Sequence, residues 1–570
     1  MKDGNSIFRS TFKSKPMRTT LNLIYNSIGK SKFNSTGGKV GIIAIIILLL
    51  FACDAGDKQR EEKPNFIFII IDDQNQDLAC FGKNHVKTPN IDKLASQGVI
   101  FPNAYVQQAV CAASRASFLT GLHPRATGVE YPYSYYFIEE VIPKYGTVGQ
   151  HFLKNGYYTR YFGKIHHGYD EVLSEPNYYP GGSRYVSEEN IEIDRILGNA
   201  GVPPYEMFDG PDTLFKDGRI GRAVIEALEK AKTKDEPFFF AVGFLKPHLP
   251  FSAPKKYWDL YKREEIPLVP NKYRPEGSPS IAFSRYNLRQ YKWQHADPDK
   301  LFTDDYARLL RHAYFACTSF VDAQIGMIMD KVEELGLSDN TYYVYCSDHG
   351  FHMGEQNHYG KTSLHEANLK SPLIISHKDL KNSGASSAAL VEYVDILPTL
   401  LDLADLPIPD HIEGISLDTL LKNPNQSFKK AVFSRQERES IGRRKGFSVR
   451  NERYRYTEWR NTVTGEILAT ELYDLLEDPL ETVNIAMMES SREVLVIMSK
   501  QLYDGWVAAV PDWIDQVAQN PEAPPAYSHG PEGVPRRKIW HEAYGGSEAD
   551  GWRKACDIRM QKEDSIRRVL

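Results

Sequence analysis

Pro64-Asn65-Phe66-Ile67-Phe68-Ile69-Ile70-Ile71-Asp72-Asp73 is the stretch of sequence that decides the fold of this chain. Six consecutive apolar residues, all aromatic or β-branched, are typical of a central strand that is buried on both faces. The run stops at two acidic residues. It therefore predicts a buried strand that carries Asp72 and Asp73 at its carboxyl end.

Three further apolar runs end in polar residues in the same way. They are Tyr157–Phe162 before Gly163-Lys164-Ile165-His166-His167, Phe238–Phe244 before Lys246-Pro247-His248, and Thr341–Cys346 before Asp348-His349. Helix-like segments lie between them, at Asn90–Gln97, Gly218–Lys230 and Asp304–Leu335. This alternation predicts an α/β fold with a large mixed, mostly parallel sheet sandwiched by helices. Ligands bind beyond the carboxyl ends of such strands, so the four polar clusters should meet there.

The rest of the chain divides by composition. We assign 65–425 to the α/β domain. Short alternating stretches at Ala431–Ser434, Lys445–Val449 and Arg453–Trp459 predict a smaller antiparallel-sheet subdomain over 426–510. Residues 511–570 are rich in Pro, Gly and charge and are interpreted as a surface tail.

The N-terminal region resembles a bacterial lipoprotein signal. Basic residues precede the apolar run Val40–Ala52, which ends at Cys53 and is shorter than the roughly 20 residues needed to span a bilayer. We expect residues 1–53 to be the signal region, Cys53 to be lipidated, and residues 54–64 to be a polar tether. An uncleaved anchor is the alternative. Either interpretation places the protein outside the cytosol, in the periplasm or on the cell surface.

Bulk composition excludes several classes of protein. Among 570 residues, 42% are hydrophobic and 25% charged, as in globular proteins, and the net charge is −5. That charge gives no general attraction to nucleic acid, and membrane contact is expected through the lipid alone. The six cysteines include no CxxC pair, which argues against a zinc ribbon or a redox motif.

The most specific motif is Val110-Cys111-Ala112-Ala113-Ser114-Arg115, followed by Leu119-Thr120-Gly121. It is similar to the signature of the sulfatase family, whose fold is that of alkaline phosphatase. The resemblance implies that a formylglycine-generating enzyme converts Cys111 into the nucleophile, formylglycine, and that Arg115 helps to hold it. The alternative for a single Cys is a small buried residue on a helix.

Two acidic pairs resemble the metal site of that family. Asp72, Asp73, Asp348 and His349, together with the modified Cys111, are implied to hold one divalent ion, Ca²⁺. Carboxylate oxygens suit a hard cation, and adjacent acids repel each other without one. His349 leaves manganese open as the ion, and solvated acidic loops are the alternative to a site.

The remaining site residues are cationic or imidazole groups, which suit the anionic oxygens of a transferring sulfuryl group. The resemblance implies that Lys164, His248 and Lys361 bind substrate, that His248 protonates the departing oxygen, and that a histidine acts as base. The spacing in the wider family selects His166 for that base. The spacing in its iduronate 2-sulfatase branch selects His167, which we prefer.

Similarity to that branch extends from about Asn65 to Ala486. It rests on Phe238–Phe251, on Ser347-Asp348-His349-Gly350 with Gly354-Glu355, and on Glu471–Asp474 with Asp478-Pro479. It implies a sulfated carbohydrate substrate, with a uronate 2-sulfate or an algal sulfated glycan as candidates. Tyr131–Phe137 and Arg443–Lys445 offer glycan contacts or are ordinary surface. A phosphatase or phosphonate ester hydrolase of the same fold and a degenerate carbohydrate-binding homologue are the competing hypotheses.

Overall fold

The computed structural model describes residues 63–129, 141–167, 171–283, 288, 291, 300–438 and 444–514. These described residues form one compact unit. The proposed signal with Cys53, nearly all of the tether, Tyr131–Phe137, Arg443 and most of the predicted tail lie outside the described residues. Among the described helices, none combines the length and apolarity needed to cross a bilayer.

A seven-stranded sheet forms the centre of the fold. Its order is β12-β2-β11-β8-β1-β6-β4. Four adjacent strands are parallel: β8 (Thr341–Ser347), β1 (Asn65–Asp72), β6 (Phe238–Pro247) and β4 (Tyr158–Gly163). These are the four apolar runs picked out in the sequence, so the prediction that their polar ends share one edge of a sheet is confirmed.

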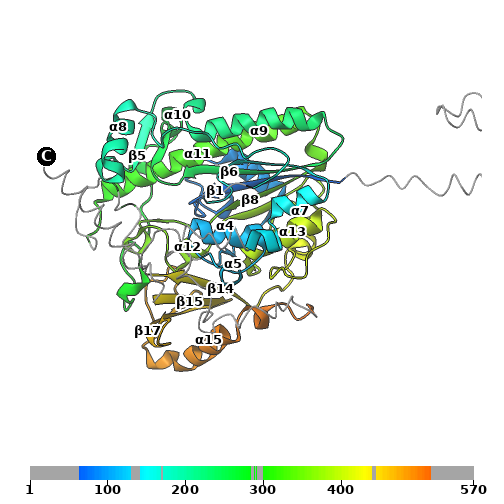
Figure 1. Ribbon diagram of the computed structural model, residues 1–570. Helices are drawn as coiled ribbons and strands as arrows, with labels where there is room; N and C mark the ends of the chain where they lie inside the picture. The colour runs from blue at the N-terminus through cyan, green and yellow to red at the C-terminus, as the bar shows by residue number, and fades with distance from the viewer. Residues whose placement is uncertain are drawn as a thin grey trace, which may run out of the picture. The chain divides into compact units, whose positions relative to one another are not determined.

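The alternating side chains of β1 enter two separate cores. Phe66, Phe68 and Ile70 pack with residues of α4 (Cys111–Thr120), α7 (Val148–Lys154) and α13 (Ile396–Leu403). Ile67, Ile69 and Ile71 pack with residues of α3 (Pro89–Ser96), α9 (Lys216–Lys232) and α11 (Asp304–Glu334). Figure 1 shows α9 and α11 on one side of the sheet and α4, α7 and α13 on the other. Burial on both faces explains why this strand has no polar alternation.

Three short strands complete the sheet, and one of them runs against all the others, which makes the sheet mixed. β11 (Leu373–Ser376) runs antiparallel to β8 and to β2 (Gly98–Ile100), and β12 (Ala385–Ser386) is parallel to β2. Together with the parallel centre and the helices on both faces, they confirm the predicted fold class.

Shorter elements connect this framework. The strands are β3 (Ala104–Tyr105), β5 (Tyr205–Phe208), β7 (Phe251–Pro254), β9 (His352–Met353), β10 (Tyr359–Gly360) and β13 (Val391–Glu392). The helices are α5 (Pro124–Thr127), α6 (Ile142–Tyr145), α8 (Glu188–Leu197), α10 (Lys255–Trp258), α12 (Glu366–Leu369) and α14 (Asp418–Lys422).

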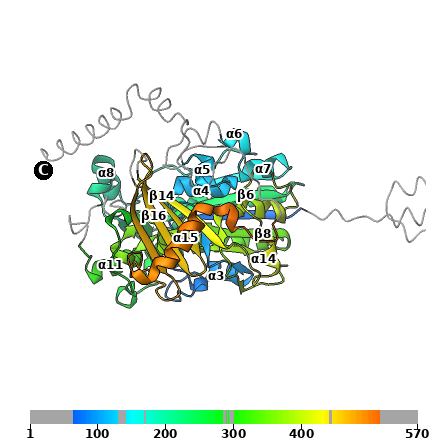
Figure 2. The same cartoon turned by 90° about the horizontal axis from the view of Figure 1, so that it is seen from below.

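The C-terminal part contains an antiparallel sheet, as expected, and a helix that the sequence analysis did not predict. Its four strands follow chain order: β14 (Ala431–Glu437), β15 (Arg444–Asn451), β16 (Tyr454–Asn461) and β17 (Ile467–Asp474). Helix α15 (Arg492–Asp504) packs over them through Met498 and Leu502 (Figure 2). The boundary between residues 425 and 426 stays a prediction.

β14 lies against the segment that precedes Cys111. The Ser434 hydroxyl donates to the carbonyl of Val106 at 2.7 Å, and the Arg435 amide donates to the carbonyl of Gln107 at 2.9 Å. The C-terminal sheet is therefore attached directly to the chain that leads into the site.

Candidate active site

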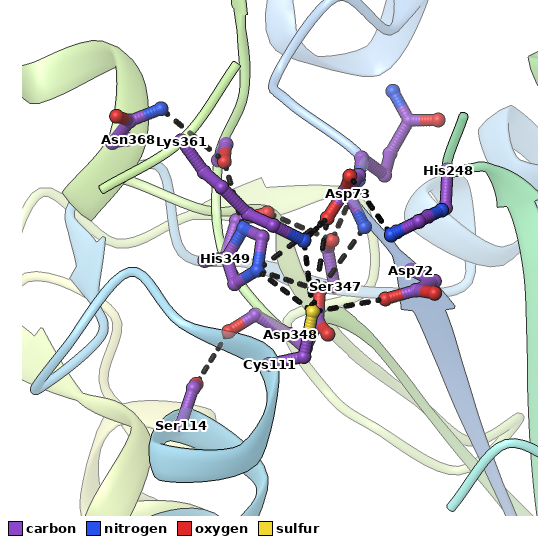
Figure 3. A network of polar contacts seen from close by, with 12 residues as sticks. Asp72, Asp73, Cys111, Ser114, His248, Ser347, Asp348, His349, Lys361 and Asn368 are labelled. Atoms are coloured by element: carbon purple, nitrogen blue, oxygen red, sulfur yellow. Dashed lines mark hydrogen bonds and ion pairs between the residues drawn. The ribbon is translucent and has the colours of Figure 1, made fainter. Parts of the chain in front are cut away.

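The polar ends of the parallel strands converge on Cys111 (Figure 3). Asp72 is the last residue of β1, and Asp73 follows with a φ of 66°, an uncommon conformation for a residue other than glycine. Asp348 and His349 follow β8. The Asp73 amide donates to Asp348 Oδ1 at 3.0 Å, which ties the two strand ends together.

Cys111 is the first residue of α4 and is 4% exposed. Its Sγ lies 3.5 Å from Asp72 Oδ1, 3.4 Å from His349 Nε2 and 2.9 Å from Lys361 Nζ. Helix N-termini favour negative charge through their free N–H groups and the helix dipole. The position therefore suits a group that becomes anionic during a reaction.

Four side chains could hold a metal ion. One donor atom from each of Asp73, Cys111, Asp348 and His349 lies within 4.8 Å of the other three, and all four residues are buried. Asp72 is adjacent to this set. Two converging carboxylates and one imidazole fit a hard divalent cation, with Asp72 Oδ1 as a further oxygen donor. Among the described residues, no other such group is found.

Arg115 links the two acidic strand ends from one turn along α4. Its Nε lies 3.0 Å from Asp348 Oδ2, and its NH2 group lies 3.5 Å from Asp72 Oδ1. It also donates to the carbonyls of Lys164 and Ile165. The guanidinium is buried, so these charge-assisted contacts fix the carboxylates in place.

Two lysines extend into the same group of side chains. Lys164 Nζ lies 2.5 Å from Asp72 Oδ2, and Lys361 Nζ lies 2.6 Å from Asp73 Oδ1. Each lysine thus pairs with one of the two adjacent acids of β1. The pairing places two ammonium groups at a site where a tetrahedral anion would need them.

The surrounding cations keep the acids ionised. Burial is the largest single influence and raises the pKa of Asp72, but the nearby positive charges outweigh it and hold the pKa well below its ordinary value. The cations are Lys164, His248, Arg115 and Lys361. The pKa of Asp73 is lowered in the same way against its burial. Both groups are therefore carboxylates at neutral pH and are available as ligands.

The Cys111 thiol itself is a poor nucleophile here. Burial raises its pKa to about 12, although Lys164 and Lys361 act in the opposite direction. The thiolate is the reactive form of cysteine, and such a pKa leaves little of it at neutral pH. An unmodified Cys111 thiol would therefore be a weak nucleophile at neutral pH in this environment.

His248 borders the site from the side away from Lys361, as Figure 3 shows. Its Nε2 lies 3.8 Å from Asp73 Oδ2, and its side chain is 36% exposed. Burial lowers its pKa, although Asp73 and Asp72 raise it. Among the groups that contact Asp73 it is the most accessible, which places it where a substrate would enter.

The two consecutive histidines after β4 have different surroundings. His166 Nε2 lies 2.9 Å from Glu171 Oε1, and Glu171 also accepts from the hydroxyl of Thr147 at 2.7 Å. For His167, burial together with the nearby charges of Lys164, Arg115 and Lys361 lowers the pKa to about 4, although Asp72 raises it. His167 is thus neutral and lies in the field of the site. Which of the two histidines acts on Cys111 stays a prediction.

Several supporting residues were not singled out from the sequence. The Ser114 hydroxyl donates to the carbonyl of Asp348, and Ser114 belongs to the Cys111 motif, which is a signal that could have identified it. No motif in the sequence around Glu171 could have identified that residue. Arg438, directly after β14, donates to the carbonyls of Thr362, Ile281 and Ala282.

Arg438 acts on the loop that carries Lys361. The neighbouring carbonyls of that loop are also held, because the Asn368 amide donates to Gly360 and His358 Nε2 lies 3.1 Å from the carbonyl of Lys361. Thr362 has a φ of 71°, so the loop needs such support to keep its shape. The position of Lys361 therefore depends on a residue from the C-terminal sheet.

Comparison with known protein families decides the relationship. The sulfatase family model matches residues 64–406, which include the candidate metal ligands, Cys111, Arg115, Lys164, His248 and Lys361. The chain belongs to the sulfatase family. It is a sulfuric ester hydrolase, and the iduronate 2-sulfatase-like branch expected from the sequence is also supported. A second model, the C-terminal part of N-sulphoglucosamine sulphohydrolase, matches residues 354–506.

Individual relatives agree with this assignment. This sulfatase is 31% identical to iduronate 2-sulfatase of Mus musculus over 500 residues, covering 74% of this chain and 90% of the relative. It also resembles the solved phosphonate monoester hydrolase of Agrobacterium radiobacter, with a TM-score of 0.64, 22% identity, and coverage of 77% of this chain and 95% of that one.

A second solved structure, determined in complex with its substrate D-glucosamine-2-N,6-O-disulfate, has a TM-score of 0.61 and 22% identity to this sulfatase. The alignment covers 77% of this chain and 97% of the other. At this identity the two structures support the fold.

Proposed function

We propose that this sulfatase hydrolyses sulfate esters of a carbohydrate with a formylglycine made from Cys111 and a single bound Ca²⁺. The observation that carries the proposal is the position of Cys111 Sγ, at the N-terminus of α4 and among buried acids, His349 and Lys361. The conversion is assigned to a formylglycine-generating enzyme of the host.

The ion and the aldehyde supply the chemistry that the thiol lacks. A hydrated aldehyde offers a hydroxyl nucleophile, and a divalent cation lowers the pKa of such a group and neutralises sulfate oxygens. Asp73, Asp348 and His349 would hold the cation, because their donor atoms converge, and Asp72 would add a further carboxylate beside them. The lowered pKa values of Asp72 and Asp73 keep these two groups ionised.

The cationic side chains have separate tasks in this proposal. Lys164 and Lys361 stabilise the negative charge that builds up on the sulfuryl oxygens. Arg115 holds the carboxylates of Asp72 and Asp348 in fixed positions through an ion pair with each. His248, the accessible group at the entrance, gives a proton to the departing sugar oxygen. His167, neutral because of its lowered pKa, removes a proton when sulfate is expelled.

The substrate class follows from the relatives and is part of the proposal. Iduronate 2-sulfatase is named for a uronate 2-sulfate, and a glucosamine disulfate is the substrate in the second solved structure. We propose a sulfated oligosaccharide or polysaccharide fragment for this chain. Lys445, on β15, belongs to the basic run considered as a glycan contact.

The competing activity is phosphonate ester hydrolysis, because a solved enzyme of that class shares the fold. We expect purified protein to hydrolyse an aryl sulfate with a kcat/KM at least about 100-fold above that for the matched aryl phosphonate. The measurement uses both esters of one phenol, followed by a panel of sulfated oligosaccharides with products assigned by NMR. A preference for the phosphonate would refute the proposed function, and hydrolysis of neither ester would favour a carbohydrate-binding homologue.

We further propose that the chain is exported and anchored through a lipid on Cys53. Support comes from the order of basic residues, the apolar run Val40–Ala52 and then Cys53. Metabolic labelling with a fatty acid should mark the wild-type protein, and Cys53→Ala should abolish the label and release the protein from the membrane fraction. A full-length protein in the cytosol would contradict this.

A further inference from the structure

The segment that carries His248 is held by a buried lysine to which the mechanism above gives no task. Lys246 lies near the end of β6, and its side chain is largely buried. Its Nζ donates to the carbonyl of His248 at 3.0 Å and also to the carbonyl of Pro250. An ammonium group has three donors and no acceptor, so two of its three donors serve this one turn of chain.

The carbonyl between these two is contacted by the His248 ring itself. His248 Nδ1 lies 2.7 Å from the carbonyl oxygen of Leu249. A carbonyl only accepts hydrogen bonds, so Nδ1 must carry a proton in this contact, and His248 can donate a proton from Nε2 only when both ring nitrogens are protonated. The other ring nitrogen, Nε2, is the one turned toward Asp73. Three successive carbonyls therefore fix both the path of the segment and the orientation of the ring.

The chain on the other side of Lys246 is anchored as well. Asp217, a buried residue of α9, accepts from the amides of Leu245 and Lys246 at 2.5 and 3.4 Å. β6 therefore ends at a fixed point, and the Lys246 side chain reaches forward from it to the turn that follows. Without that side chain, the carbonyls of His248 and Pro250 lose their charged donor.

We propose that Lys246 is a positioning residue for His248, which holds Nε2 at the point where the departing oxygen leaves. The proposal rests on the proton-donor role given to His248 above. The proposal predicts that loss of Lys246 lowers kcat most for substrates whose leaving group needs a proton. A residue needed for stability alone would affect all substrates alike.

The test compares two sulfate esters on Lys246→Met, which is one atom shorter than lysine, keeps an unbranched apolar side chain and removes the donors. A sugar sulfate leaves as a strongly basic alkoxide, whereas 4-nitrophenyl sulfate leaves as a stable phenolate. We expect kcat for the sugar sulfate to fall by about 10²- to 10³-fold, within the usual range for general acid catalysis, and that for the aryl sulfate by less than about 3-fold. Equal losses on both substrates would overturn the proposal.

A double-mutant cycle supplies the second readout. His248→Gln should show the same dependence on the leaving group, and the double variant should be no slower than His248→Gln alone, because residues that act as one unit are not additive. Independent, multiplied losses would overturn the proposal. Lys255→Met is the matched control, since this lysine forms an exposed ion pair with Asp259 at 2.6 Å, and it should leave both activities unchanged.

Failure of the inference can be told apart from failure of the proposed function. Wild-type protein that hydrolyses neither ester would refute the sulfatase activity itself. Leaving-group dependence in His248→Gln but none in Lys246→Met would refute the role of Lys246 alone. A loss in His248→Gln that is equal on both esters would overturn the proton-donor role and this proposal with it. Lys246→Gln, which keeps a shorter neutral donor, gives the same comparison where the methionine variant does not fold.

Discussion

Replacing Cys111 with alanine is expected to lower kcat for an aryl sulfate by about 10⁴-fold or more. The side chain at this position is the proposed nucleophile, and it contacts His349 and Lys361 at 3.4 and 2.9 Å. The acids and lysines that remain would still bind an anion but would have nothing to attack it with. The loss should therefore appear in kcat, with the dissociation constant for inorganic sulfate changed little.

Two further measurements accompany this variant. Peptide mass spectrometry of active wild-type protein should find an aldehyde at position 111. Cys80→Ala is the matched control, because Cys80 is a partly exposed cysteine that precedes α3 and makes no contact with the site residues described above. It should keep full activity. Fully active protein that carries only unmodified thiol would rule out the proposed nucleophile.

Asp348→Ala is expected to lose the bound ion and at least about 10³-fold in kcat. Asp348 is both a candidate ligand and the partner of Arg115, whose Nε lies 3.0 Å from its Oδ2. Removing the carboxylate also leaves a buried guanidinium without its closest acid, and breaking such a pair costs about 3–5 kcal/mol in the free energy of unfolding. Metal analysis, kcat and denaturant unfolding measure the three effects.

A second buried aspartate separates lost stability from lost metal. Asp322 of α11 accepts from the amides of Asn90 and Ile91 at 3.0 and 2.8 Å and so supports the start of α3. Asp322→Ala should be destabilised too, by about 1–3 kcal/mol, yet bind one Ca²⁺ per chain as the wild type does. Unchanged metal content in Asp348→Ala would remove this residue from the ligand set.

The framework of the fold could be predicted because its strands are buried on both faces. In the sequence, such strands are unbroken apolar runs. The observed ends lie within three residues of the predicted ones for β1, β4, β6 and β8. The short strands β2 and β12 have three and two residues and carry no such pattern. β2 is placed by pairing with β11, and β12 by pairing with β2, which is tertiary information.

The site was predictable where its residues follow strands, and less so elsewhere. Asp72, Asp348 and Lys164 stand directly after strand ends, so sheet topology alone brings them together. The choice between His166 and His167 was open because a loop after β4 has no fixed periodicity from which to infer direction. Glu171, four to five residues further on, contacts His166, and nothing in the local sequence indicates that pairing.

Lys246 illustrates a different limit. It stands in the Lys-Pro-His motif after an apolar strand, where a lysine is readily interpreted as a pocket cation. Its side chain instead reaches forward to two backbone carbonyls of the same segment, those of His248 and Pro250. Such a role depends on the path of the following turn, which the identity of the residues does not reveal.

The contact between Arg438 and the Lys361 loop has a consequence for the timing of maturation. Arg438 is made 327 residues after Cys111. At about 5–20 residues per second, synthesis of that stretch takes about 15–65 s. Throughout this interval the nascent chain lacks the strand that lies against residues 106 and 107 and the guanidinium that holds the loop. Under the proposed modification, we expect a converting enzyme to reach the cysteine more easily before this later-synthesised part of the chain is in place.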